Sequence, residues 1–215
     1  MDLLLIRHGQ PRRQHAADGD GADPHLTPRG RADADRLAAY LAAQPATAPA
    51  VVYSSPMRRA RQTAAAITAR LVVPLHVDDR LREFDHGAPS YVPLELTESG
   101  ESQAALWRAL ETGVWGAHTF DPDAFAHRVD AVFDEIIDGH RSTTVAVVCH
   151  GGVINSFLGR VLGRPRGMFF QPEYTSVCRV VASARGRRLL TLNETTHLQL
   201  AAAGEPDPVG DGGHG

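Results

Sequence analysis

Short runs of apolar residues alternate along the chain with longer stretches in which apolar residues recur every three or four positions. The short runs have the length and composition of buried strands. One of them, TTVAVVCH, is almost continuously apolar, which is typical of a central parallel strand covered on both faces. The predicted strands lie at 3–6, 51–53, 73–77, 143–150, 175–183 and 187–195.

The longer stretches carry helix signals at both ends. Three of them begin with a hydroxyl or carboxylate residue followed by proline, which suits a capping residue and the first helical position. These starts are Thr27-Pro28, Ser55-Pro56 and Asp121-Pro122. The helix from Ser55 is expected to reach about Leu71, and the helix from Asp121 is expected to end at Gly139. A fourth helix is expected directly after the strand at 143–150.

This alternation predicts an α/β fold, a three-layer α/β/α sandwich with a mostly parallel central sheet. We expect residues 1–200 to form a single domain, because the sequence contains no internal repeat and no second core. Residues 84–120 are expected to form an irregular insertion over one end of the sheet, with a short helix near 101–111. Residues 201–215 are rich in Gly, Pro and Asp and are expected to form a flexible tail.

Composition narrows the function classes. The 215 residues carry a net charge of -3 with neutral histidines, so no general basic field exists for nucleic acid. The apolar run at 3–6 is cut short by Arg7, so it predicts neither a signal peptide nor a membrane span. The two cysteines, Cys149 and Cys178, lack metal-ligand spacing and are expected to be reduced core residues in a cytoplasmic protein.

The strand ends carry the candidate chemistry. The first strand ends at Arg7-His8-Gly9, and the strand at 143–150 ends at His150-Gly151-Gly152, where a helix begins. In open α/β sheets ligands bind beyond the carboxyl ends of the strands, so we expect the two imidazoles to lie together there. Free N–H groups of Gly151 and Gly152 at the helix start would add an anion-binding element.

Arginines and a carboxyl group complete this candidate anion site. The helix after 51–53 carries three arginines in its first two turns, Arg58, Arg59 and Arg61. Guanidinium groups suit phosphate oxygens, and their charge would keep a nearby histidine neutral and nucleophilic. A shielded carboxylic acid would protonate the leaving group, and LREFDHG offers Glu83 and Asp85 for this role.

The ordered motif set resembles a known family. LLLIRHGQ, YSSPMRRARQTA, LREFDHG and VVCHGGVINSF look like the four signature segments of the histidine phosphatase superfamily, the phosphoglycerate-mutase-like proteins. Two further stretches, DPHLTPRGRADADRLAAYL and NETTHL, are also similar to segments of that family. The resemblance covers about residues 3–198, and it implies the phosphoglycerate-mutase-like form of the α/β/α sandwich.

The resemblance implies a role for each matching residue. His8 looks like the nucleophile that becomes phosphohistidine, and Glu83 looks like the proton donor, with Asp85 as its rival. The family pattern R-A-x-x-T selects Arg59 among the three arginines. The implied phosphate ligands are Arg7, Gln10, Arg59, His150 and Gly151. The resemblance implies no metal and no other cofactor, because arginines and imidazoles supply the positive charge.

The function expected from these residues is that of an acid-type histidine phosphatase acting on a small phosphorylated metabolite. The alternatives are a phosphoglycerate mutase and a non-catalytic phospho-ligand or protein-binding domain. The 84–120 segment has Arg108 as its one arginine or lysine, which favours hydrolysis over transfer through a bisphosphorylated intermediate. Pro11 and HGAPSYVPLE depart from the family pattern, so the resemblance names no substrate. Related proteins are often dimers, so the resemblance also allows a homodimer, although the sequence identifies no interface.

Overall fold

The computed structural model describes residues 1–16, 21–93, 100–183 and 186–199, and a six-stranded sheet lies at its centre. In spatial order the strands are β10 (Gly186–Glu194), β9 (Val177–Ser183), β1 (Asp2–Arg7), β8 (Thr144–Cys149), β3 (Val51–Ser54) and β4 (Leu75–Val77). β1, β8, β3 and β4 are parallel, whereas β9 is antiparallel to both β1 and β10. The expected mostly parallel sheet and the final strand pair are therefore confirmed.

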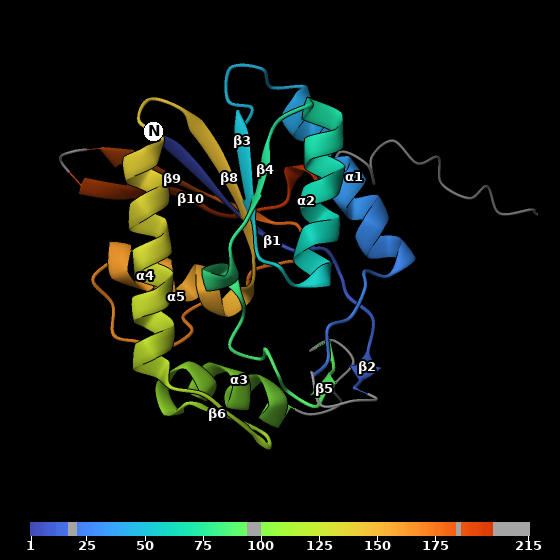
Figure 1. Cartoon of the computed structure of the whole chain (residues 1–215), viewed down its shortest axis with the longest axis vertical. Helices are drawn as coiled ribbons and strands as arrows, with labels where there is room; N and C mark the ends of the chain where they lie inside the picture. The colour runs from blue at the N-terminus through green and yellow to red at the C-terminus, as the bar shows by residue number, and fades with distance from the viewer. Residues whose placement is uncertain (17–20, 94–99, 184–185, 200–215) are drawn as a thin grey trace, which may run out of the picture.

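Helices cover both faces of the sheet. α1 (Pro28–Ala42) and α2 (Arg58–Leu71) lie on one side of the strands, and α4 (Pro122–Gly139) and α5 (Gly151–Val161) lie on the other (Figure 1). Successive residues of a strand point to opposite faces. Leu4 and Ile6 accordingly pack in one buried cluster with α1 and α2, while Leu3 and Leu5 pack in a second cluster with α4 and α5. This confirms the three-layer architecture.

The capping residues set two of the helix starts as expected. The Thr27 hydroxyl accepts a hydrogen bond from the Gly30 N–H, and the Asp121 carboxylate accepts bonds from the N–H groups of Asp123 and Ala124. These bonds satisfy N–H groups that the first turn of a helix leaves without a partner.

The predicted start of α2 is wrong. Met57, and not Ser55, is the N-cap, and the helix begins at Arg58. The Ser55 N–H still donates to the Val148 carbonyl of β8 at 3.0 Å, so the chain continues its strand pairing through this residue. The helix therefore starts two residues later than the sequence signal indicated.

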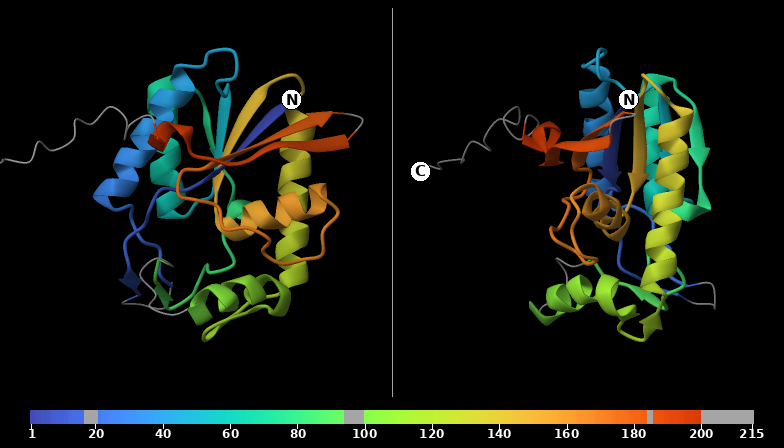
Figure 2. Two further views of the ribbon diagram at one scale, coloured as in Figure 1. Left: turned by 180° about the vertical axis from the view of Figure 1, so that it is seen from behind. Right: turned by 90° about the vertical axis from the view of Figure 1, so that its left-hand side faces the viewer.

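The 84–120 segment lies beyond the carboxyl ends of β1 and β8, at one end of the molecule in every view (Figures 1 and 2). It follows the 3-10 turn η1 (Asp79–Leu81) and contains more regular structure than expected. Its elements are β5 (Ser90–Tyr91), α3 (Gly100–Thr112), β6 (Val114–Trp115) and β7 (His118–Thr119). β5 pairs with β2 (Gln14–His15), and β6 pairs with β7.

The tail predicted at 201–215 lies outside the described residues. No helix within the described part of the chain has the length and apolar character needed to cross a membrane.

Candidate active site

The two imidazoles lie together because their strands are neighbours in the sheet. Arg7 at the end of β1 is in register with Cys149 at the end of β8, so the next residue on each strand is a histidine. The ring centroids of His8 and His150 are 5.1 Å apart, and both side chains are buried. The adjacency predicted from the strand ends is correct.

The His8 ring is held in one protonation form. Its Nδ1 lies 2.8 Å from the Gly9 carbonyl oxygen, and an oxygen acceptor requires that this nitrogen carry the hydrogen. The Arg59 Nε–H donates to His8 Nε2 at 3.2 Å, which requires a lone pair on Nε2. Burial, and then the charges of Arg59 and Arg7, hold the His8 pKa well below its usual value. His8 is therefore a neutral imidazole whose lone pair is on Nε2, where it accepts the Arg59 N–H in this structure.

The structure distinguishes Arg59 from its two neighbours. Arg58 is exposed and pairs with Asp23, and Arg61 is also exposed, whereas Arg59 is 1% exposed. One terminal nitrogen of Arg59 donates to both Asp85 oxygens, at 2.9 and 3.0 Å. Its other terminal nitrogen is buried and has no hydrogen-bond partner among the described residues.

Arg7 is the second buried arginine at this edge. One of its terminal nitrogens donates to the Pro172 carbonyl, and its guanidinium lies 3.9 Å from the centre of the Tyr174 ring. These two contacts fix the plane of the guanidinium. Its Nε is buried and, within the described residues, has no partner.

His150 caps the start of α5 and is oriented by a serine. Its Nε2 lies 2.8 Å from the Ser55 hydroxyl, while its Nδ1 is buried and lacks a partner within the described parts of the chain. Burial, followed by the charge of Arg59, holds the His150 pKa well below its usual value. The ring is thus neutral, and one of its nitrogens is available to a ligand.

Glu83 is a buried carboxyl group without an arginine partner. Its Oε1 accepts the Phe84 N–H at 3.0 Å, and its Oε2 accepts the Gly152 N–H at 2.7 Å. Burial and the nearby Asp85 charge raise the Glu83 pKa to about 7, so a proton is held near neutral pH. A Cβ on Gly152 would lie 2.3 Å from Glu83 Oε1, so only glycine allows this contact. The expectation of a free Gly152 N–H is therefore wrong.

Most of these groups border a hollow of about 60 Å³ that we call the strand-end pocket. His150 is not part of the lining, but its ring lies next to that of His8, which is. Its lining comprises Arg7, His8, Arg59, Glu83, Phe84, Asp85, Ser90, Tyr91, Val92, Trp115, Gly151 and Gln171. Buried polar groups normally have hydrogen-bond partners. The unpartnered nitrogens of Arg7, Arg59 and His150 thus identify a site for an anion with several acceptor oxygens.

Gln10 is placed elsewhere. Its side-chain oxygen accepts a hydrogen bond from the Thr27 hydroxyl at 3.0 Å, and the residue lines a second hollow that Arg7 also borders. Gln10 is not part of the strand-end pocket lining. The structure therefore brings together Arg7, His8, Arg59, Glu83, His150 and Gly151, but not Gln10.

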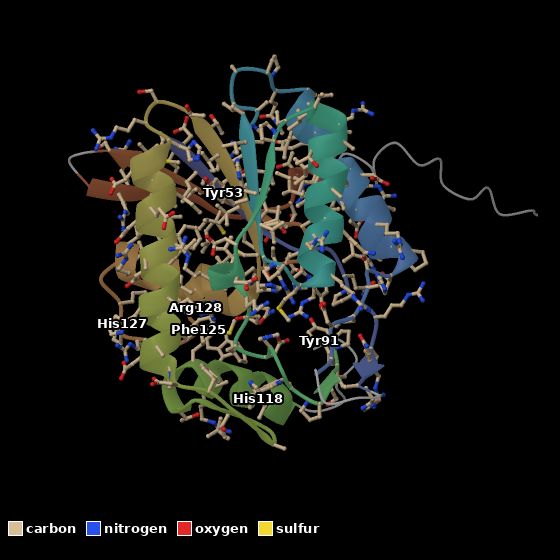
Figure 3. All side chains as sticks on the ribbon, in the orientation of Figure 1. Tyr53, Tyr91, His118, Phe125, His127 and Arg128 are labelled. Atoms are coloured by element: carbon tan, nitrogen blue, oxygen red, sulfur yellow. The ribbon has the colours of Figure 1, made fainter. Side chains whose placement is uncertain are left out.

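Several supporting residues were not identified from the sequence. Ser55 was interpreted as a helix cap, and Asp85 only as a rival proton donor, because neither spatial partner is near in sequence. Thr63, which accepts the Gly9 N–H at 2.9 Å, was present in the R-A-x-x-T pattern without a role. Tyr91, which lies against the Arg59 guanidinium, comes from the 84–120 segment (Figure 3). No sequence signal marked Tyr174.

Comparison with known proteins identifies the family. The sequence model of the histidine phosphatase superfamily (branch 1) matches residues 3–195. The chain belongs to this superfamily. The motifs that predicted it, from RHG at the start to the final NETTHL, lie within or at the end of the matched range.

Individual members of the histidine phosphatase superfamily differ in how much of this chain they match. The Mycobacterium tuberculosis "Bifunctional protein Rv2228c" is 34% identical over 79% of this chain, which spans 46% of that relative. The chain thus spans about half the length of that relative. Phosphoserine phosphatase 1 of Hydrogenobacter thermophilus is 28% identical over 91% of this chain and 93% of its own length. Bacillus stearothermophilus YhfR superposes with a TM-score of 0.70 at 24% identity, over 92% of this chain and 98% of YhfR, which supports the fold.

Proposed function

We propose that this protein is a phosphatase that hydrolyses small phosphomonoesters through a phosphohistidine on His8. The observation that carries the proposal is the neutral His8, whose Nε2 lone pair accepts the Arg59 Nε–H near buried nitrogens of Arg7, Arg59 and His150 that have no partner among the described residues. When substrate binds, this Arg59 N–H must turn from Nε2 to the phosphoryl group. Phosphoserine phosphatase 1, which matches nearly the whole of this chain, supports a small phosphorylated metabolite as the substrate.

In the first step, the His8 Nε2 lone pair attacks phosphorus and forms an N–P bond while the ester P–O bond breaks. Negative charge on the phosphoryl oxygens is met by the free N–H groups of Arg7 and Arg59 and by His150. Gly151 contributes the positive end of α5, because it is the first residue of that helix and lines the pocket.

Glu83 is the proposed acid. Protonated Glu83 transfers its proton to the departing alkoxide, which leaves as the alcohol. In the second step the Glu83 carboxylate takes a proton from water as that water attacks phosphorus, and the N–P bond breaks to release phosphate and restore His8. The raised Glu83 pKa of about 7 suits both duties and gives the enzyme its acid-side activity.

Asp85 has a different role in this proposal. Both of its oxygens accept hydrogen bonds from Arg59, so the carboxylate is committed to holding that guanidinium. Glu83, in contrast, accepts only backbone N–H groups. This difference selects Glu83 over Asp85 as the proton donor.

The test is phosphate release combined with trapping of the covalent intermediate. Wild-type protein mixed with ³²P-labelled p-nitrophenyl phosphate and quenched in alkali should retain label, which acid then releases, as expected for phosphohistidine. His8→Ala should lose both the label and at least about 10³-fold of kcat, because it removes the nucleophile. His76→Ala, at an exposed histidine of β4, is the matched control and should behave as wild type. Full activity of His8→Ala would refute the mechanism.

A further inference from the structure

The wall of the strand-end pocket opposite the phosphoryl-binding groups has a distinct chemistry. It comes mainly from the 84–120 segment, through Phe84, Ser90, Tyr91, Val92 and Trp115, with Gln171 from the chain after α5. We propose that the preferred substrates are phosphomonoesters of uncharged, hydroxyl-bearing ring alcohols, such as sugars or nucleosides, and not of carboxylate-bearing alcohols. This inference rests on the proposed function and adds the class of leaving group.

The first argument concerns cations. Arg7 and Arg59 are the arginines of the pocket lining among the described residues, and the proposed function assigns both to the phosphoryl group. A carboxylate on the leaving group would need a further cation, since an unpaired buried charge is costly. The described lining supplies none, and a carboxylate there would face Glu83 and Asp85.

The sequence of the whole 84–120 segment is likewise poor in cationic residues and rich in acidic ones. It has one arginine, Arg108, which is exposed on α3, and no lysine. Its acidic residues are Asp85, Glu95, Glu98, Glu101 and Glu111. A region with this excess of negative charge lowers the local concentration of anionic groups and favours neutral or cationic ones.

The second argument concerns an unpartnered acceptor. The side-chain Oε1 of Gln171 is buried and, among the described residues, has no hydrogen-bond donor. A hydroxyl or amino group of a ligand would satisfy this oxygen, whereas a carboxylate offers no hydrogen and would repel it. The leaving-group wall thus contains a buried acceptor without a donor among the described residues, and a sugar-like hydroxyl would supply one.

The third argument concerns ring surfaces. Phe84 is stacked on Phe120 with centroids 5.1 Å apart, and Trp115 meets Phe84 edge-on at 6.4 Å. These contacts hold the rings in place before a ligand arrives, which reduces the entropy cost of binding. Figure 3 shows Tyr91 on the α2 side of this region and His118 of β7 on the α3 side. A ring-shaped alcohol packs against such aromatic walls better than a short charged chain does.

Matched substrate pairs test the charge preference. 4-Carbamoylphenyl and 4-carboxyphenyl phosphate differ in one neutral or anionic group, as do glycerol 3-phosphate and 3-phosphoglycerate. We expect kcat/KM to favour the neutral member of the aryl pair by at least tenfold, and the glycerol pair to follow the same order. Equal or reversed values for the aryl pair would overturn the inference while leaving the phosphatase proposal intact. No phosphate release from either aryl ester would instead refute the proposed function.

Two wall variants test the cause. Val92→Arg places a cation in the wall and should raise kcat/KM for 4-carboxyphenyl relative to 4-carbamoylphenyl phosphate by about tenfold, mainly through KM. Val72→Arg adds the same charge at the exposed end of α2, outside the pocket lining, and should leave the ratio unchanged. Equal ratios for the two variants would contradict an effect of the wall.

Gln171 is tested separately. Gln171→Leu should lower kcat/KM for glycerol 3-phosphate at least fivefold and change that for propyl phosphate, which lacks the hydroxyls, less than twofold. Gln44→Leu, at the end of α1, is the matched control for the loss of an amide and should change neither value. A parallel loss on both substrates would show that Gln171 contacts no leaving-group hydroxyl.

Discussion

The strand ends and the 84–120 segment border the same pocket but are built differently. Arg7 and His150 stand at the ends of six-residue strands that are paired on both sides and buried between helices. The segment has strands of only two residues, and Val114 on β6 is 51% exposed. In the proposed mechanism the strand ends, together with Arg59 of α2, hold the groups that act on phosphorus, whereas the segment supplies most of the wall for the leaving group. The chemistry and the choice of substrate can therefore change independently.

Glu83 lies at the boundary between these two regions. It precedes the 84–120 segment in sequence, but its carboxyl group is bound to the Gly152 N–H at the start of α5. The acid is thus positioned by the same strand-helix junction that carries His150. We expect substitution of Glu83 to lower kcat, as substitutions at the strand ends should, and not to change the choice between neutral and anionic leaving groups, as substitutions in the wall should.

The largest expected effect is that of Glu83→Gln. Loss of the proton donor should lower kcat for an alkyl phosphate by about 10³-fold, as for other general acids. For p-nitrophenyl phosphate, whose leaving group needs no proton, we expect a loss in the phosphorylation step of less than about tenfold. Single-turnover kinetics with the two substrates measure this difference.

Equal losses on both substrates would show that the amide merely disrupts the pocket. Asp85→Asn is the comparison at the rival carboxyl group. It should lower the rate of phosphorylation by both substrates to the same extent, because Arg59 loses the carboxylate that holds it.

The second largest effect is expected for Ser55→Ala. The Ser55 hydroxyl accepts the Met57 N–H at 3.3 Å, which leaves its own hydrogen to donate to His150 Nε2. His150 then carries its hydrogen on Nδ1, the nitrogen without a protein partner. Loss of this orientation should lower kcat by about 10²-fold, the effect of losing one donor to a developing charge.

The ¹⁵N spectrum of His150 tests this tautomer directly. Wild-type protein should show a protonated Nδ1, and Ser55→Ala should show a mixture of tautomers. Ser54→Ala is the matched control, because the Ser54 hydroxyl bonds only to a backbone carbonyl in the described structure. A protonated Nε2 in the wild type would contradict the assignment, whether or not the variants fold.

The pH dependence of activity tests the proposed role of Glu83 without a mutation, and its expected effect near pH 7 is smaller than those of the two substitutions. Since the Glu83 pKa is raised to about 7, the acid is protonated below that pH and ionised above it. For an alkyl phosphate, kcat/KM should fall about tenfold per pH unit above 7, because only the protonated form reacts. In single-turnover measurements, Glu83→Gln should remove this decline. A wild-type profile that stays flat to pH 9 would contradict Glu83 as the acid.

The strand ends were largely predictable from sequence, and the wall was not. Continuous apolar runs that end in Arg7-His8 and in His150 indicate both the sheet and the meeting of the imidazoles. The 84–120 segment has no such continuous apolar run. Its short strands are held by contacts between residues that are distant in sequence, so no local pattern marks them. One example is the bond between His118 and the Phe84 carbonyl, at 2.8 Å.

Errors at the strand ends arose where a local signal had a distant partner. Ser55-Pro56 looks like a helix start, but the backbone of Ser55 pairs with β8 and its hydroxyl binds His150. Gly152 looks like a free helix N-terminus, but its N–H is bound to Glu83, 69 residues away in sequence. In both cases a contact with a residue distant in sequence determines the local structure, and the local sequence pattern does not reveal that contact.

The smallest expected effect is that of Gln10→Ala, which separates proximity in sequence from membership of the pocket. Gln10 is two residues from His8, but its side chain accepts the Thr27 hydroxyl at the start of α1. Removing the amide should change kcat/KM less than about threefold, which corresponds to under 1 kcal/mol. The lost hydrogen bond should instead lower the free energy of unfolding by about 1 kcal/mol, measurable by urea denaturation. A loss of activity comparable to that of Arg7→Ala would show that Gln10 contacts the phosphoryl group during the reaction. The set of phosphoryl-binding residues that follows β1 would then extend to Gln10.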